Sequence, residues 1–208
     1  MKVTVFGATG KAGSLVVKES VARGWDTTAF VRDAARIDGH AGVTVAQGDA
    51  RSLDDVSRAV RGRDAVFVCL GMRDITVPST EFSDGVKTIV RAMKASGVRR
   101  ILLIASTVAL PGPNAGFRGT AGLPEILYNV AAEHIRNYET LRDSGLEWTA
   151  MCPATLMEDI PVGHARFAYE ALPPGKPEAG YADLARTMVD LLAEPRSMGM
   201  RVGLVSVR

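Results

Sequence analysis

The sequence predicts a single α/β domain built on a doubly wound, mostly parallel β-sheet. Strand-like and helix-like segments alternate along the whole 208-residue chain. Several strand-like segments are apolar throughout, which is typical of parallel strands covered on both faces. The chain has no internal repeat, no low-complexity tract and no linker, and its length suits one domain better than two. We therefore expect one domain over residues 1–208.

Short apolar runs bounded by turn residues indicate the strands. They are expected at 2–6, 26–31, 43–47, 65–70, 100–105, 147–151 and 201–207, with a short edge strand at 165–171. Helical spacing predicts helices at 12–23, 52–61, 78–96, 124–141 and 181–193. Ser52 is suited to an N-cap, Pro124 to a first helical position, and Gly24, Gly97 and Gly145 to helix ends. Residues 111–122 and 153–163 are expected to be irregular.

Composition excludes several functional classes. The chain is 47% hydrophobic and 23% charged, as expected of a soluble globular protein, and its net charge of +2 argues against nucleic-acid or anionic-membrane binding. The longest nearly apolar run, 101–110, is half a membrane span, and no signal peptide is recognisable. Cys69 and Cys152 are expected to be buried, reduced thiols, and three histidines without a ligand cluster argue against a metal. We expect a cytoplasmic protein, either a monomer or a weak homodimer.

A glycine-rich loop joins the first predicted strand to the first helix. It reads Gly7-Ala8-Thr9-Gly10-Lys11-Ala12-Gly13. Glycines in this context allow a tight turn and a close approach of the backbone to a pyrophosphate, while the helix N-terminus offers free N–H groups. The alternative is a turn that needs glycine only for its dihedral angles. We predict a dinucleotide-binding loop.

The residues after the second and third strands indicate which dinucleotide binds. An NAD site would have an acidic residue after the second strand, but Arg32 stands there, with Arg36 one turn later. Guanidinium groups suit the 2′-phosphate of NADPH, provided that Asp33 faces solvent; a solvated charge cluster is the alternative. Asp49 and Ala50 follow the third strand, where the adenine would lie, and Leu70 and Gly71 follow the fourth.

These motifs resemble those of a known family. The glycine loop, Val31-Arg32-Asp33, Gly48-Asp49, Asp64-Ala65-Val66 with Leu70-Gly71, and the stretches 89–98 and 134–146 are similar to the atypical short-chain dehydrogenases of the NAD(P)H-binding, NmrA-like kind, and most of all to their flavin and biliverdin reductases. The resemblance covers about residues 2–155.

The resemblance implies a role for each matching residue. Thr9, Gly10, Lys11 and Ala12 would hold the pyrophosphate, Arg32 and Arg36 the 2′-phosphate, and Asp49 and Ala50 the adenine. Leu70, Gly71 and Arg73 would line the cofactor, and Ser106 would lie beside the nicotinamide. Pro153-Ala154-Thr155 matches a stretch that carries a histidine near the nicotinamide in biliverdin reductases, and Thr155 replaces that histidine here.

The expected chemistry follows from the absence of a catalytic tyrosine–lysine pair. Short-chain dehydrogenases that reduce carbonyls usually carry Tyr-x-x-x-Lys, but no lysine follows Tyr128 at that spacing. Reduction of a flavin or bilin demands less, because the conjugated acceptor delocalises the charge and solvent can supply the proton. We therefore expect an NADPH-dependent reductase of such an acceptor, with Ser106 as the candidate catalytic residue and His134 in a structural or surface role.

Loops at about 107–123, with Phe117 and Arg118, and at about 153–180 are expected to hold the acceptor.

Two other functions stay open. One is a non-catalytic NADP(H) sensor of the NmrA-like type, which would bind the cofactor and signal through a protein partner. The other is an isomerase or reductase of an unrelated small carbonyl compound.

Overall fold

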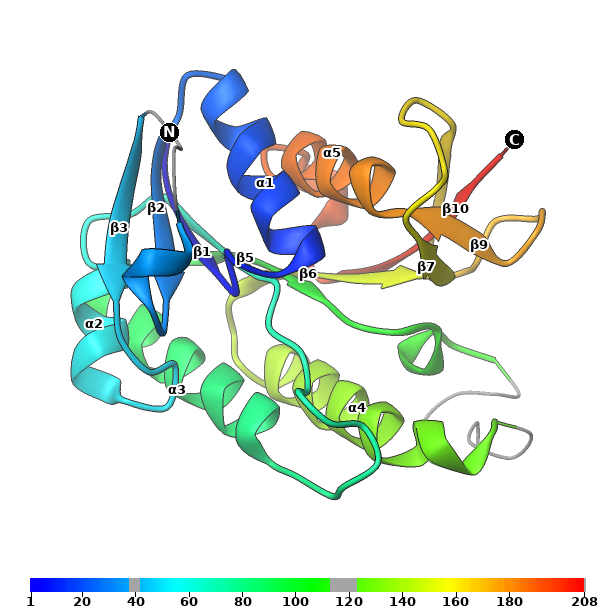
Figure 1. The fold of residues 1–208 in the computed structure, drawn as a ribbon, viewed down its shortest axis with the longest axis horizontal. Helices are drawn as coiled ribbons and strands as arrows, with labels where there is room; N and C mark the ends of the chain where they lie inside the picture. The colour runs from blue at the N-terminus through cyan, green and yellow to red at the C-terminus, as the bar shows by residue number, and fades with distance from the viewer. Residues whose placement is uncertain (38–41, 113–122, 208) are drawn as a thin grey trace.

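A single eight-stranded sheet forms the centre of the molecule (Figure 1). The computed structural model describes residues 1–37, 42–112 and 123–207. The sheet order is β3-β2-β1-β4-β5-β6-β10-β8, and neighbouring strands are parallel except for the pair β10–β8. The strands are β1 (Lys2–Phe6), β2 (Asp26–Val31), β3 (Val43–Gln47), β4 (Ala65–Val68), β5 (Arg100–Ile104), β6 (Glu147–Pro153), β8 (Ala165–Tyr169) and β10 (Met200–Ser206). The doubly wound, mostly parallel architecture is confirmed.

Helices cover both faces of this sheet. They are α1 (Lys11–Ala22), α2 (Leu53–Val60), α3 (Glu81–Ser96), α4 (Tyr128–Arg142) and α5 (Tyr181–Leu191). In Figure 1, α1 and α5 lie side by side on one face, and α2, α3 and α4 lie on the other. The order in which strands are added to the sheet reverses at β1: β2 and β3 lie on one side of it, and β4, β5 and β6 lie on the other. Such a switch point leaves a crevice at the carboxyl ends of the strands.

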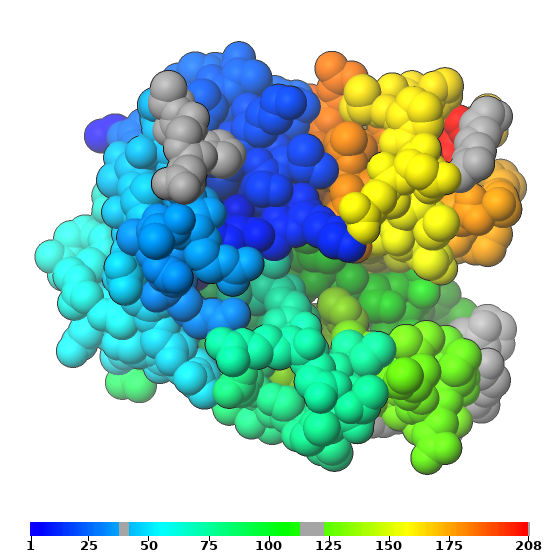
Figure 2. Space-filling view, viewed as in Figure 1, coloured from blue at the N-terminus to red at the C-terminus, as the bar shows by residue number. Residues whose placement is uncertain are grey.

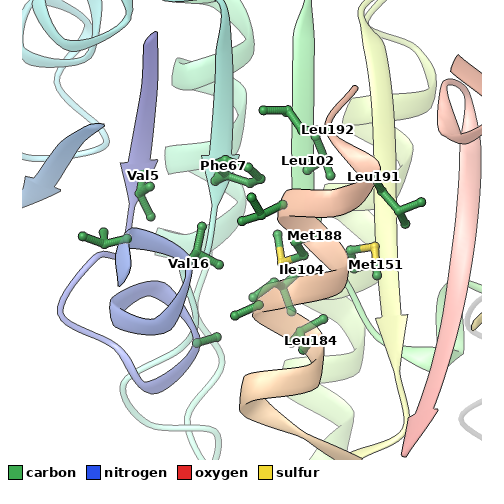
Figure 3. Close-up of a cluster of buried hydrophobic side chains, with 14 of the residues drawn as sticks. Val5, Val16, Phe67, Leu102, Ile104, Met151, Leu184, Met188, Leu191 and Leu192 are labelled. Atoms are coloured by element: carbon green, nitrogen blue, oxygen red, sulfur yellow. The ribbon is translucent and has the colours of Figure 1, made fainter. Parts of the chain in front are cut away.

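The central strands bury both of their faces. In β1, Val5 belongs to the hydrophobic cluster under α1 and α5, and Phe6 to the cluster on the opposite face. Figure 3 shows the first cluster, in which Met188 and Leu184 of α5 pack over Leu102 and Ile104 of β5. Because successive side chains point to opposite faces, a strand with two covered faces needs apolar residues at every position. This is why β4 reads as an unbroken apolar run in the sequence, and β5 as one after its first residue.

The helix ends carry the predicted signals. Ser52 caps α2 by accepting a hydrogen bond from the Asp55 N–H at 3.4 Å. Gly97 ends α3 with a left-handed φ of 74°, which glycine adopts at little cost. Pro124 precedes a 3₁₀ turn, Glu125–Leu127, so α4 begins four residues after the proline rather than at it.

Two predictions were wrong in detail. The stretch 153–163 is not wholly irregular, because it holds β7 (Thr155–Met157), which pairs in parallel with β9 (Glu178–Gly180) in a separate two-stranded sheet. Helix α3 begins at Glu81 rather than near residue 78. Its start is fixed by the buried carboxylate of Glu133 on α4, which accepts hydrogen bonds from the Ser83 N–H and hydroxyl, each at 2.8 Å. A long-range cap of this kind leaves no local sequence signal.

Part of the first predicted acceptor loop lies outside the described residues. Residues 113–122, including Phe117 and Arg118, belong to that part, and the described start of the loop forms a 3₁₀ turn, Thr107–Ala109. No helix among the described residues is both long and apolar enough to cross a membrane.

Candidate functional site

A cleft of about 860 Å³ opens at the carboxyl ends of β1, β2, β3 and β4. Figure 2 shows this hollow between the N-terminal part of α1 above and the segment that leads into α3 below. Its volume lies within the range of pockets that enclose a ligand of cofactor or drug size. Twelve of the residues predicted to bind a cofactor line it: Gly7, Thr9, Gly10, Lys11, Ala12, Arg32, Arg36, Asp49, Ala50, Leu70, Gly71 and Arg73.

The glycine loop forms one wall of the cleft, and two of its glycines are required by close contacts. Gly7 has φ of 78°, and a Cβ there would lie 2.4 Å from the Cys69 carbonyl oxygen. A Cβ on Gly13 would lie 2.1 Å from the Gly7 carbonyl oxygen. Gly13 therefore lets α1 pack directly on the loop, and it does so without lining the cleft.

The beginning of α1 is open to an anion. Gly10 occupies the N-cap position, and within the described residues no side chain caps this end or places an acid in the first turn. Free N–H groups and the helix dipole at such an end favour a negatively charged ligand. A loop whose glycines allow no Cβ at positions 7 and 13, followed by an uncapped helix, fits the pyrophosphate of a dinucleotide.

Two arginines line the cleft at the end of β2. Arg32 follows the strand directly, Arg36 belongs to a 3₁₀ turn (Ala34–Arg36), and both are exposed. Asp33 between them is not among the cleft residues, and its carboxylate accepts a hydrogen bond from the Ala35 N–H at 3.1 Å. As predicted, Asp33 turns away from the cleft, so its carboxylate does not neutralise the positive charge of Arg32 and Arg36 there.

Arg51 also lines the cleft, and the sequence analysis missed it. Its guanidinium donates hydrogen bonds to both carboxylate oxygens of Asp49, at 2.7 Å for Nη2 and 3.1 Å for Nε, and to Glu81 at 3.1 Å. These bonds, with a smaller contribution from Arg32, lower the pKa of Asp49. Asp49 was predicted to accept from the adenine amino group; in the structure its carboxylate orients Arg51.

A salt bridge crosses the mouth of the cleft beside the glycine loop. The Lys11 ammonium pairs with Glu158, which follows β7, and lies 5.9 Å from the centroid of the Tyr181 ring. Both charged side chains are exposed, and the pairing raises the pKa of Lys11. Lys11 was predicted to bind pyrophosphate; in the structure its ammonium pairs with Glu158.

His134, for which the sequence favoured a structural or surface role, is among the residues that line the cleft. Its ring meets Phe82 edge to face at 5.5 Å between centroids. Burial lowers the pKa of His134 to about 4, so the imidazole is neutral at pH 7. No spacing signal along α4 could have revealed this, because the contact arises from the packing of α4 against α3.

The remaining predicted residues lie apart from the cleft. Ser106, Pro153 and Thr155 are not among the described residues that line the cleft. Ser106 precedes the turn Thr107–Ala109 without capping it, Pro153 ends β6 in the core, and Thr155 is exposed at the start of β7. Their roles toward a cofactor stay predictions.

Neither cysteine is poised as a nucleophile. Cys69 lines the cleft and Cys152 lies in β6, both are free thiols, and burial raises the pKa of each to about 12. Nucleophilic cysteines have a lowered pKa instead. Within the described ranges, no group of three or more histidine, cysteine, aspartate or glutamate residues is arranged to hold a metal ion.

Known proteins share this architecture over its full length. The chain is 24% identical over 219 aligned residues to the uncharacterized protein YwnB of Bacillus subtilis, with 99% of each covered. The crystal structure of a candidate NADH-flavin reductase from Streptococcus pneumoniae superposes with a TM-score of 0.83, 24% identity and complete coverage of both chains. A Rossmann-fold NAD(P)-binding family protein from Shigella flexneri gives a TM-score of 0.74 at 22% identity, covering 99% of this chain and 94% of that one.

The sequence model of the NAD(P)H-binding family matches residues 7–195. This range includes the glycine loop, the arginines after β2 and every other residue that lines the cleft. The chain therefore belongs to the NAD(P)H-binding family, and its fold is Rossmann-like.

Proposed function

We propose that this protein is an NADPH-dependent reductase that delivers a hydride to a flavin or to another conjugated acceptor such as a bilin. The observation that carries the proposal is the pair Arg32 and Arg36 at the cleft edge of β2, where an NAD site would hold an acidic residue. NADPH, when bound, supplies the hydride.

The cofactor's binding groups can be assigned to residues of the cleft. The glycine loop and the uncapped start of α1 fit the pyrophosphate, for the steric and electrostatic reasons given above. Arg32 and Arg36 would bind the 2′-phosphate through charge-assisted hydrogen bonds, each worth about 1.5–3 kcal/mol. With Asp33 turned aside, this edge of the cleft favours NADPH over NADH.

The cleft suits an acceptor that needs little acid–base help. Of the four tyrosines, all within the described residues, Tyr181 alone lines the cleft. The nearby Lys11 ammonium lies over the Tyr181 ring and pairs with Glu158, so the two are not arranged as a tyrosine–lysine acid. Leu156, which packs in the same hydrophobic cluster as Tyr181, lines the cleft with it and offers apolar surface that a flat conjugated ring could cover. The name of the Streptococcus pneumoniae protein supports a flavin as the acceptor.

The test is to follow NADPH oxidation with flavin mononucleotide, with biliverdin and without an acceptor. We expect oxidation that saturates with one of the two acceptors, and a much weaker reaction with NADH at the same concentration. Tight NADPH binding without oxidation under any acceptor would support the sensor function instead. NADPH oxidation only with a small carbonyl compound would instead support a reductase of such a compound.

A further inference from the structure

His134 presents an unpartnered polar group to the cleft. It lies on α4, is partly buried, and forms no hydrogen bond to any described residue. Its Nδ1 is fully buried without a partner. The ring lines the cleft, and from the burial of Nδ1 we infer that the other ring nitrogen, Nε2, is the one that faces it.

The position of the proton on the ring follows from this difference. A neutral imidazole carries one N–H and one acceptor nitrogen. A buried N–H without a partner has lost its hydrogen bond to water, and so has a buried lone pair. If the proton is on the accessible nitrogen, however, its N–H can still donate a hydrogen bond to a ligand or to solvent. The N–H is also the group that a carbonyl-bearing ligand in the cleft would select. The ring therefore keeps its proton on Nε2, facing the cleft, and buries the lone pair of Nδ1.

The surroundings hold the ring in this orientation. Phe82 packs edge to face against it, and the neighbouring Glu133 is fully buried with its carboxylate bonded to Ser83 and Arg136. The bonds to Ser83 tie α4 to the first turn of α3, and Asn129 ties α4 to the segment that precedes α3 by donating to the Ile75 carbonyl oxygen at 3.1 Å. A donor held by a rigid frame can stabilise developing charge without reorganising.

We propose that the Nε2–H of His134 donates a hydrogen bond to a carbonyl oxygen of the conjugated acceptor and stabilises the negative charge that the acceptor gains with the hydride. This inference rests on the proposed function. Hydride transfer moves negative charge away from the nicotinamide and onto the acceptor. A hydrogen-bond donor therefore stabilises the transition state more when it contacts the acceptor than when it contacts the cofactor. The imidazole keeps its proton, and solvent supplies the one proton that completes the reduction.

The test compares three variants with wild type. His134→Gln keeps an N–H donor on a side chain of similar reach, and His134→Leu removes the donor. Asn137→Leu is the matched control, because Asn137 is also on α4 and buried with both side-chain polar atoms unpartnered, but it lies outside the cleft. We expect kcat/KM for flavin mononucleotide to fall about 10²-fold in His134→Leu, to recover largely in His134→Gln, and to change little in Asn137→Leu. The Kd for NADPH should stay within about twofold in all three.

Nitrogen NMR of the imidazole gives a reading that does not depend on activity. We expect the Nε2–H tautomer in the wild-type protein, and a shift of the Nε2 resonance when flavin mononucleotide is added. An Nδ1–H tautomer, or full activity in His134→Leu, would overturn the inference while leaving the reductase function intact. A loss of NADPH affinity in His134→Leu would overturn it too, because the donor would then serve the cofactor. Absence of reductase activity in the wild type would instead refute the proposed function.

Discussion

The Cβ position of Gly13 lies 2.1 Å from the carbonyl oxygen of Gly7, so the first turn of α1 rests directly on the loop that precedes it. Alanine at position 13 must push α1 away from the loop. We predict that Gly13→Ala destabilises the protein by about 3 kcal/mol and abolishes NADPH binding, as measured by chemical denaturation and by titration. Gly24→Ala is the control for backbone strain alone: Gly24 lies just after α1 and has φ of 70°, but a Cβ there would meet nothing within 4 Å. Equal effects of the two substitutions would argue against a steric role for Gly13.

The central strands could be predicted from the sequence because each carries its own evidence. Val3 to Phe6 are apolar or buried at every position, and the glycine loop follows at a fixed place. The position of Arg32 at the edge of the cleft could likewise be predicted, since a strand end and the next residues are local features.

The missed features all depend on contacts between distant residues. Arg51 is held by its neighbour Asp49 and also by Glu81, thirty positions later, and the start of α3 depends on Glu133, fifty positions after Ser83. Glu158 meets Lys11 across 147 positions. Charged residues at such positions look like ordinary surface residues until the fold brings them together.

Arg32 should discriminate between the two nicotinamide cofactors. We predict that Arg32→Asp weakens NADPH binding by at least about 10-fold more than NADH binding, because it removes a charge-assisted hydrogen bond and adds repulsion toward the 2′-phosphate. Titration of both cofactors measures the ratio of the two dissociation constants. Arg91→Asp makes the same charge change at an exposed position of α3 outside the cleft and controls for net charge. Equal losses for NADPH and NADH would remove Arg32 from the phosphate site.

Asp49 should oppose NADPH rather than bind its adenine. Its carboxylate holds Arg51 in an exposed ion pair, so we predict that Asp49→Asn leaves the guanidinium paired with Glu81 but no longer with Asp49, and raises the preference for NADPH over NADH by about 2- to 5-fold. The double variant Asp49→Asn with Arg51→Leu should lose this gain. If Asp49 bound the adenine amino group instead, Asp49→Asn would weaken both cofactors by the same factor.

Glu158 should compete with the cofactor for Lys11. We predict that Glu158→Gln tightens NADPH binding a few-fold and raises its dependence on salt, with little change in thermal stability, because exposed ion pairs contribute about 1 kcal/mol or less. Asp190→Asn is the matched control, since Asp190 pairs with Arg23 beyond the other end of α1. Weaker NADPH binding in Glu158→Gln would show that the carboxylate positions Lys11 for the phosphate.

His134 should give the fold a measurable dependence on pH. Its pKa of about 4 in the folded protein lies below its ordinary 6.5, so the unfolded chain binds the proton more tightly. The stability that the neutral ring contributes is complete above pH 6.5 and is lost as the pH falls toward 4. We predict that the difference in unfolding free energy between wild type and His134→Gln shifts against wild type over this window. A difference that is constant with pH would mean that His134 titrates alike in both states.

The reductase function itself is tested most directly by single-turnover oxidation of NADPH under anaerobic conditions, with flavin mononucleotide added over a range of concentrations. We predict a rate that saturates with the flavin and that falls sharply in His134→Leu, while the NADPH dissociation constant stays unchanged. A rate that rises linearly with flavin and is the same with and without protein would contradict the account, even if NADPH binds.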